Sequence, residues 1–168
     1  LVQAAGLLRQ VFAWAAGGES GVVRCGDDVA VALLPPDAPL PSANLRCEEL
    51  EDYFRYAGVS SLPRADLRVS LLDWPHDVIR HHVAILGENL EHRLAEGEYR
   101  EIADGVFAAA TAELGPYTVT DTRDGPILLE DGAQIGPYVL LSGPSHIGAV
   151  ARVLLHAAIK DAVTLGHT

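Results

Sequence analysis

From position 129 onward, the hydrophobic pattern of the chain repeats every six residues. An α-helix would show a period of 3.6 residues, and β-hairpins would show turn residues at wider intervals. A six-residue unit instead matches a short strand and a corner, so that three units close a coil of about 18 residues around a shared aliphatic column. The column positions are Leu129, Ile135, Leu141, Ile147, Val153, Ile159 and Leu165, and the small or β-branched corner positions are Ala133, Val139, Ser145, Ala151, Ala157 and Val163.

The same phase continues backwards through Leu114 and Ala108, which predicts a solenoid over residues 106–168. Segment 112–119 (AELGPYTV) nearly repeats as 133–140 (AQIGPYVL), at an offset of 21 residues. Because this offset exceeds one coil by about three residues, residues 121–126 are expected to bulge from a corner. The alternative is a β-sandwich rich in Gly-Pro turns, but sandwiches do not keep one phase over so many repeats.

The first part of the chain predicts a mixed α/β segment over residues 1–74. An apolar stripe, Leu50, Tyr53 and Phe54, is expected to be buried by a short helix. The expected elements are a helix over 2–16 stopped by Gly17-Gly18, a hairpin of strands 22–25 and 29–34 around Gly26-Asp27-Asp28, a stiff proline connector over 35–41, a helix over 45–57 and a strand over 66–72.

A longer helix is predicted between Pro75 and Gly97. Pro75 suits a first helical position, and Gly97 can end the helix. We expect this segment, residues 75–97, to be a linker helix between the α/β segment and the solenoid. Its apolar face is Ile79, Val83, Leu86, Leu90 and Leu94, and its charged side carries Arg80, Glu88, Glu91 and Arg93.

The composition of the chain excludes some classes of binding partner but says little about the fold. The 168 residues hold 12 Lys+Arg against 23 Asp+Glu, for a net charge of −11, which argues against nucleic acid or an anionic membrane as the main partner. No apolar run approaches the ~18 residues of a transmembrane helix, and a cytoplasmic location is expected. Cys25 and Cys47 are expected to be reduced structural thiols. Because the chain has no methionine and stops in mid-repeat, we expect it to be an internal piece of a longer protein.

Several motifs of the chain resemble known proteins. The hexads Ile135-Gly136-Pro137-Tyr138-Val139 and Ile147-Gly148-x-x-Ala151 resemble the hexapeptide-repeat left-handed β-helix. Segments 21–35 (GVVRCGDDVAVALLP), 74–79 (WPHDVI) and 125–137 (GPILLEDGAQIGP) resemble a family of sugar-nucleotidyltransferase-like proteins. That family is similar to the bifunctional UDP-N-acetylglucosamine pyrophosphorylases/glucosamine-1-phosphate N-acetyltransferases.

The resemblance implies the C-terminal part of a nucleotidyltransferase-like α/β domain over 1–74, followed by the linker helix and a truncated, single-stranded left-handed parallel β-helix over 106–168. In the full-length protein, a sugar 1-phosphate would react with a nucleoside triphosphate, with Mg²⁺, and the solenoid would transfer an acyl group from acetyl-CoA. Mg²⁺ and acetyl-CoA are thus implied by the resemblance alone. The solenoid would also assemble the protein as a homotrimer.

Neither active site of that family is expected to be complete in this chain. No glycine-rich phosphate loop bearing arginine and lysine precedes Pro75; Gly17-Gly18 follows a predicted helix and has no lysine beside it. The family's acyl-transfer histidine is expected beyond Thr168. The alternative is a non-catalytic trimerisation or interaction scaffold with a degenerate nucleotidyltransferase domain.

The candidate site residues are histidines and aspartates, and simpler roles explain most of them. His146, His156 and His167 occupy different hexad phases, so they are expected on solvated surfaces, and their spacing argues against the metal site of a zinc hydratase. Any of the three could act as a base, and His167 is the weak candidate for a catalytic base because it is closest to the coils expected beyond Thr168. No metal site is predicted. The other residues considered are His76, His81 and His82 on the linker helix, Asp73 and Asp77 beside its start, and the turn residues Asp27, Asp28, Asp121 and Asp124.

Overall fold

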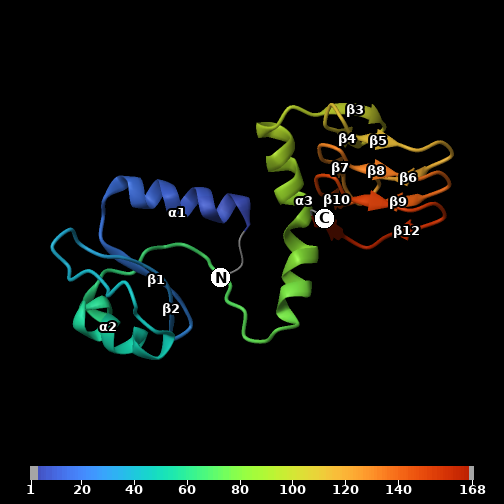
Figure 1. Cartoon of the computed structure of the whole chain (residues 1–168). Helices are drawn as coiled ribbons and strands as arrows, with labels where there is room; N and C mark the ends of the chain where they lie inside the picture. Colours follow the sequence, from blue (N-terminus) through green and yellow to red (C-terminus); the bar gives the residue numbers. More distant parts are fainter. Residues whose placement is uncertain (1–3, 167–168) are drawn as a thin grey trace. The chain divides into compact units, whose positions relative to one another are not determined.

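The computed structural model describes residues 4–166 and divides the chain into two compact units after Pro75 (Figure 1). The first unit contains a helix, a hairpin and short helical segments, and the second contains a long helix and a parallel β-solenoid. In order, the elements of the first unit are α1 (Ala5–Gly17), β1 (Gly21–Cys25), β2 (Asp28–Leu33), η1 (Cys47–Glu49), α2 (Leu50–Tyr56) and η2 (Val59–Ser61).

The predicted hairpin is confirmed in the first unit. Strands β1 and β2 pair antiparallel from Gly21 opposite Leu33 to Cys25 opposite Asp28. Helix α1 ends where the glycine pair predicts, because Gly18 adopts a left-handed conformation and donates its N–H to the carbonyl of Ala15. The side chain of Trp14 covers Gly21 so closely that a Cβ there would lie 3.0 Å from the indole ring.

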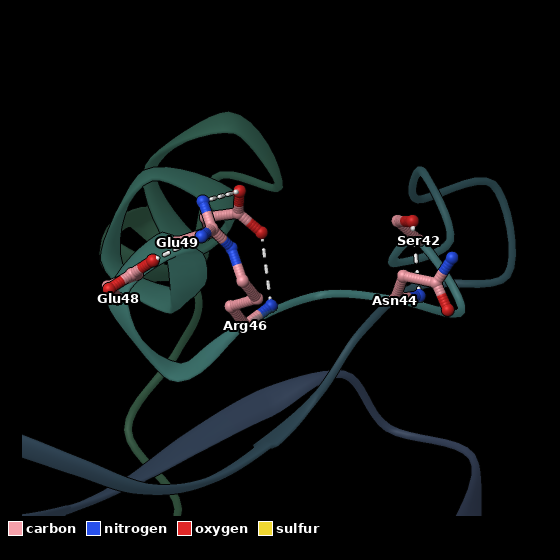
Figure 2. Close-up of polar contacts among 5 residues, drawn as sticks. All are labelled: Ser42, Asn44, Arg46, Glu48 and Glu49. Carbon is pink, nitrogen blue, oxygen red and sulfur yellow. Dashed lines mark hydrogen bonds and ion pairs between the residues drawn. The ribbon is translucent and has the colours of Figure 1, made fainter.

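The short helix of this unit begins with an arginine–glutamate cap. The Glu49 carboxylate accepts a hydrogen bond from the backbone N–H of Arg46 (3.0 Å) and one from its guanidinium (3.1 Å). Figure 2 shows this arrangement, together with the ion pair from Arg46 to Glu48 and the hydrogen bond from the Asn44 N–H to the Ser42 hydroxyl. These contacts satisfy a backbone donor before the first turn, and they hold the pKa of Glu49 below its ordinary value.

Two predictions about the first unit are wrong. Residues 66–72 form no strand, although Leu67, Val69 and Leu71 keep the expected alternation of exposure. The segment before residue 66 makes one bridge to the edge of β1, at Arg64, where the N–H of Val22 donates to Pro63 and its carbonyl accepts from Ala65. Residues 66–72 therefore have no hydrogen-bonded partner among the described strands. The helix predicted over 45–57 is present as the contiguous η1 and α2, but Leu50 is 39% exposed and not buried as predicted, because the small core consists of Val22, Val23 and Val59.

The second unit begins with helix α3 (Asp77–Glu96), two residues later than Pro75 predicted. A short strand, β3 (Arg100–Ala103), then pairs antiparallel with the first solenoid strand. The rest of the unit is a parallel β-solenoid of three turns whose strands form three sheets (Figure 1). The sheets consist of β4 (Val106–Ala108), β7 (Ile127–Leu129), β10 (Ser145–Ile147) and β13 (Val163–Leu165); of β5 (Glu113–Leu114), β8 (Gln134–Ile135) and β11 (Arg152–Val153); and of β6 (Val119–Asp121), β9 (Leu140–Ser142) and β12 (Ala158–Ile159).

The strand register confirms the hexad phase and the predicted corner loop. Leu114 pairs with Ile135, an offset of 21 residues, whereas Ile135 pairs with Val153, an offset of 18. The extra residues lie between β6 and β7, at 122–126, while only Gly143 and Pro144 separate β9 from β10. The aliphatic column is the core, with the small corner residues packed beside it; its buried members include Leu129, Ile135, Leu141, Ile147 and Val153.

We expect Val153→Asp to unfold the solenoid. The substitution places an unpaired carboxylate inside the column, which costs about 3 kcal/mol or more of unfolding free energy. Arg152→Asp is the matched control, because Arg152 is exposed on the same strand. Chemical denaturation followed by circular dichroism measures both variants. Equal stability of Val153→Asp and the wild type would contradict the inward placement of Val153.

Candidate functional site

Helix α3 packs on the outer face of the β4–β7–β10–β13 sheet. Phe107, Leu128, His146 and Thr164 form one outward row across this sheet. Leu128 is fully buried because Leu86 and Leu90 of α3 pack against it. Three apolar side chains in the first half of the helix, Val78, Ile79 and Val83, remain exposed.

A polar cluster centred on Glu130 lies at this helix–sheet junction. Glu130 directly follows β7, and its side chain is only 12% exposed. Its Oε1 atom accepts a hydrogen bond from Nε of Arg93, in the last turn of α3, at 2.5 Å, and lies 3.0 Å from Nε2 of His146 on β10. Its Oε2 atom accepts a hydrogen bond of 2.9 Å from the hydroxyl group of Tyr99, which lies just before β3. The carboxylate thus ties α3 and its following loop to two solenoid strands.

The cluster favours an ionised Glu130 between a protonated tyrosine and a charged arginine. Burial opposes ionisation of Glu130, but hydrogen bonds from His146, Tyr99 and Arg93 outweigh it and lower the pKa of the carboxyl. Burial and the neighbouring carboxylate raise the pKa of Tyr99. For Arg93, burial acts to lower the pKa, but contacts with Tyr99 and Glu130 raise it overall.

The contacts of this cluster support a positioning role. A carboxylate–imidazole contact can orient a catalytic histidine. Here, however, Glu130 already accepts bonds from two other donors, and the side chain of His146 is only 17% exposed. A buried charge that is fully paired in this way fixes the elements that carry its partners.

The structure places the predicted histidines in three different situations. The prediction that His146 lies on a solvated surface is wrong. Its side chain lies under α3 and against Glu130, because its row of the sheet is the one that the helix covers. His156 is exposed, as expected. His167, the candidate catalytic base, lies outside the described residues.

The remaining candidates do not converge on one site. Asp27 and Asp28 lie at the hairpin turn, Asp73 lies in the bend before α3, and His81 and His82 lie half-buried on the helix. Asp77 is paired with Arg80 at 2.6 Å, and His76 lies 3.9 Å from it. Within residues 4–166, no group of three or more His, Cys, Asp or Glu side chains could hold a metal ion.

Asp121 is the last residue of β6, and Asp124 lies in the corner loop that follows it. Arg123 donates to Asp121 from its side chain and from its backbone N–H, which holds the pKa of that carboxyl at about 2. This pairing stabilises the loop and leaves Asp121 engaged within it.

Sequence reasoning missed an aromatic column on one corner of the solenoid. Tyr117, Tyr138 and His156 occupy the same hexad position, the fourth, in successive coils, and each adopts a left-handed backbone conformation. The rings of Tyr117 and Tyr138 stack with centroids 5.0 Å apart, and those of Tyr138 and His156 with centroids 5.4 Å apart. The repeated Gly-Pro-Tyr was the available signal. Glu130 had no such signal, since its partner Arg93 is 37 residues away.

We expect Glu130→Gln to lower the unfolding free energy of the solenoid unit by about 2 kcal/mol, because it weakens a buried charge network. Glu113→Gln is the matched control, since Glu113 is exposed on β5 and its loss should change stability by less than about 0.5 kcal/mol. Urea denaturation of the two variants compares these values. Equal losses would show that the junction does not depend on Glu130.

The contribution of Glu130 is also expected to depend on pH. A carboxyl whose folded-state pKa is lowered stabilises the fold above its unfolded pKa, near 4.5, and loses that contribution as the pH falls through the folded value. The stability difference between wild type and Glu130→Gln should therefore be full at neutral pH and shrink below about pH 4.5. A difference that stays constant to about pH 2 would contradict this assignment.

No match to this chain is found among protein-family models, curated proteins or solved structures. Across residues 4–166, none of the helices combines the length and the apolar character needed to cross a membrane.

Proposed function

We propose that the chain is part of a sugar-1-phosphate nucleotidyltransferase/hexapeptide acyltransferase-like protein of UDP-N-acetylglucosamine-type metabolism. In this proposal, the first unit belongs to the nucleotidyltransferase-like domain, α3 is the linker helix and the solenoid is left-handed. The observation that carries the proposal is the winding of the hexads into a parallel solenoid directly after a helix that packs on it. This order matches what the motifs imply.

The described residues support a positioning role within such a protein. The Glu130 cluster fixes α3 on the solenoid, so the helix leaves the solenoid in one defined direction. Among residues 4–166, no group of three or more His, Cys, Asp or Glu side chains could hold a metal ion, so a Mg²⁺ site in this proposal would rely on fewer protein ligands or on the phosphates of the substrate. The sugar phosphate, the nucleoside triphosphate and acetyl-CoA would bind to parts of the protein that complete these sites.

A second candidate function is a non-catalytic interaction scaffold. Two observations favour it: the Glu130 carboxylate is occupied by internal partners, and the aromatic column is exposed. A scaffold needs a rigid body and an accessible surface, and these features supply both.

Assays of two chains separate the two functions. With UTP, N-acetylglucosamine 1-phosphate and Mg²⁺, the 168-residue chain is expected to release no pyrophosphate, because no phosphate loop precedes Pro75. A longer natural chain that contains these residues should release it. Pyrophosphate release by the 168-residue chain would contradict the prediction that it lacks the triphosphate site. Inactivity of the longer chain, in this assay and in acetyl transfer from acetyl-CoA to glucosamine 1-phosphate, would favour the scaffold.

A further inference from the structure

The apolar face of α3 is buried in the second half of the helix and exposed in the first half. One continuous stripe runs along the helix at steps of four, three and four residues; it consists of Ile79, Val83, Leu86 and Leu90. Leu86 and Leu90 are 5% and 2% exposed, whereas Ile79 and Val83 are 70% and 50% exposed. The difference therefore comes from what lies beside each half of the helix.

Helix α3 runs along the stack of coils and extends past the last coil that the structure describes. Shortly after the helix ends, Tyr99 binds Glu130 and the chain enters β3, which pairs with the first solenoid strand. Leu86, near the middle of the helix, packs in one cluster with Ala162, which lies just before the last strand, β13. Figure 1 shows the first half of α3 extending beyond β12. This half therefore has no described coil beside it.

The length of the exposed stripe corresponds to about two further coils. An α-helix rises about 1.5 Å per residue, and neighbouring strands lie about 4.8 Å apart. In the covered half, Leu86 to Leu94 spans about 12 Å, which is close to the roughly 14 Å between the first and last of four strands. Ile79 lies seven residues before Leu86, or about 10 Å along the helix axis. Two coils stacked after β13 would span that distance.

The exposed half also contains residues that form helices poorly on their own. Val78, Ile79 and Val83 are β-branched, and Gly87 lies where this half meets the covered one. β-Branched residues lose side-chain freedom in a helix, and glycine loses more backbone freedom than any other residue. A helix of about ten residues is marginal in water, so most of its stability must come from packing of its apolar face. The first half of α3 therefore needs a cover.

We propose that Ile79 and Val83 are the docking face for solenoid coils that follow β13 in a longer natural chain. Such coils extend the sheet that already binds the second half of α3, so the new contact continues an existing one. Their corner and outward positions are expected to be small or apolar, as Ala162 and Leu128 are in the described coils. The inference goes beyond the proposed function, because the docking needs no substrate and applies equally to a scaffold.

Amide hydrogen exchange of α3 tests the proposal in two chains, the 168-residue chain and a longer natural chain with at least two more coils. In the 168-residue chain, amides 82–86 should exchange about 10-fold or more faster than amides 90–95, because an uncovered helix half opens locally. In the longer chain, amides 82–86 should exchange about 10-fold or more slowly than they do in the 168-residue chain, because the added coils cover the stripe.

Substitutions in the stripe test whether the apolar contact is responsible. Ile79→Gln and Val83→Gln, made together in the longer chain, should return amides 82–86 to fast exchange, since glutamine keeps the helix propensity but removes the contact. Ala84→Gln is the matched control, because Ala84 is exposed and lies about 100° around the helix from Val83, so exchange should match the wild type. In the 168-residue chain, neither variant should change the melting temperature.

Slow exchange of amides 82–86 in the 168-residue chain would overturn the proposal, because another part of the chain or a second copy would then cover the face. Equally fast exchange in both chains, or no effect of the double substitution in the longer chain, would also overturn it. So would a reading frame that ends directly after Thr168, or unfolding of the double variant in the 168-residue chain, where both side chains are exposed. Exchange is measured without substrates, so a failed transferase assay leaves this result intact.

Discussion

The solenoid depends on one constraint: each coil must place its aliphatic side chains directly over those of the coil before it. A single coil cannot bury its own inner face, so Ile135 is covered only because Leu114 and Val153 pair with its two sides. The same stacking satisfies the backbone hydrogen bonds between coils. The three extra residues of the first coil are tolerated because they leave the stack at a corner.

The register of the coils also determines which side chains lie on each outer face of the solenoid. One outward row carries Phe107, Leu128 and His146, and it needs a cover, which α3 provides together with the Glu130 cluster. Apolar packing and a buried charge network act here on the same junction. The hydrophobic contacts hold the helix on the sheet, and the hydrogen bonds of Glu130 set where its last turn lies. A proposed linker helix requires such a defined attachment.

The solenoid could be predicted from the sequence because its contacts repeat at fixed intervals. The hexad phase predicted the inward positions and a corner loop at 121–126, which the structure places at 122–126, and the hairpin turn was equally local. Predictions failed where distant partners decide, as for residues 66–72, which lack a neighbouring strand, and for Leu50, which lies outside the small core. Glu130 could not be predicted, because no local pattern connects it with Arg93 and Tyr99.

The most direct measurement of the central claim is the coil register in solution. Methyl-to-methyl nuclear Overhauser effects should connect Leu114 with Ile135 and Ile135 with Val153, because these residues are neighbours in the stack at offsets of 21 and 18 residues. Observing both contacts would establish the aliphatic column and the corner loop together. Their absence, or contacts at a constant offset through all coils, would contradict the account.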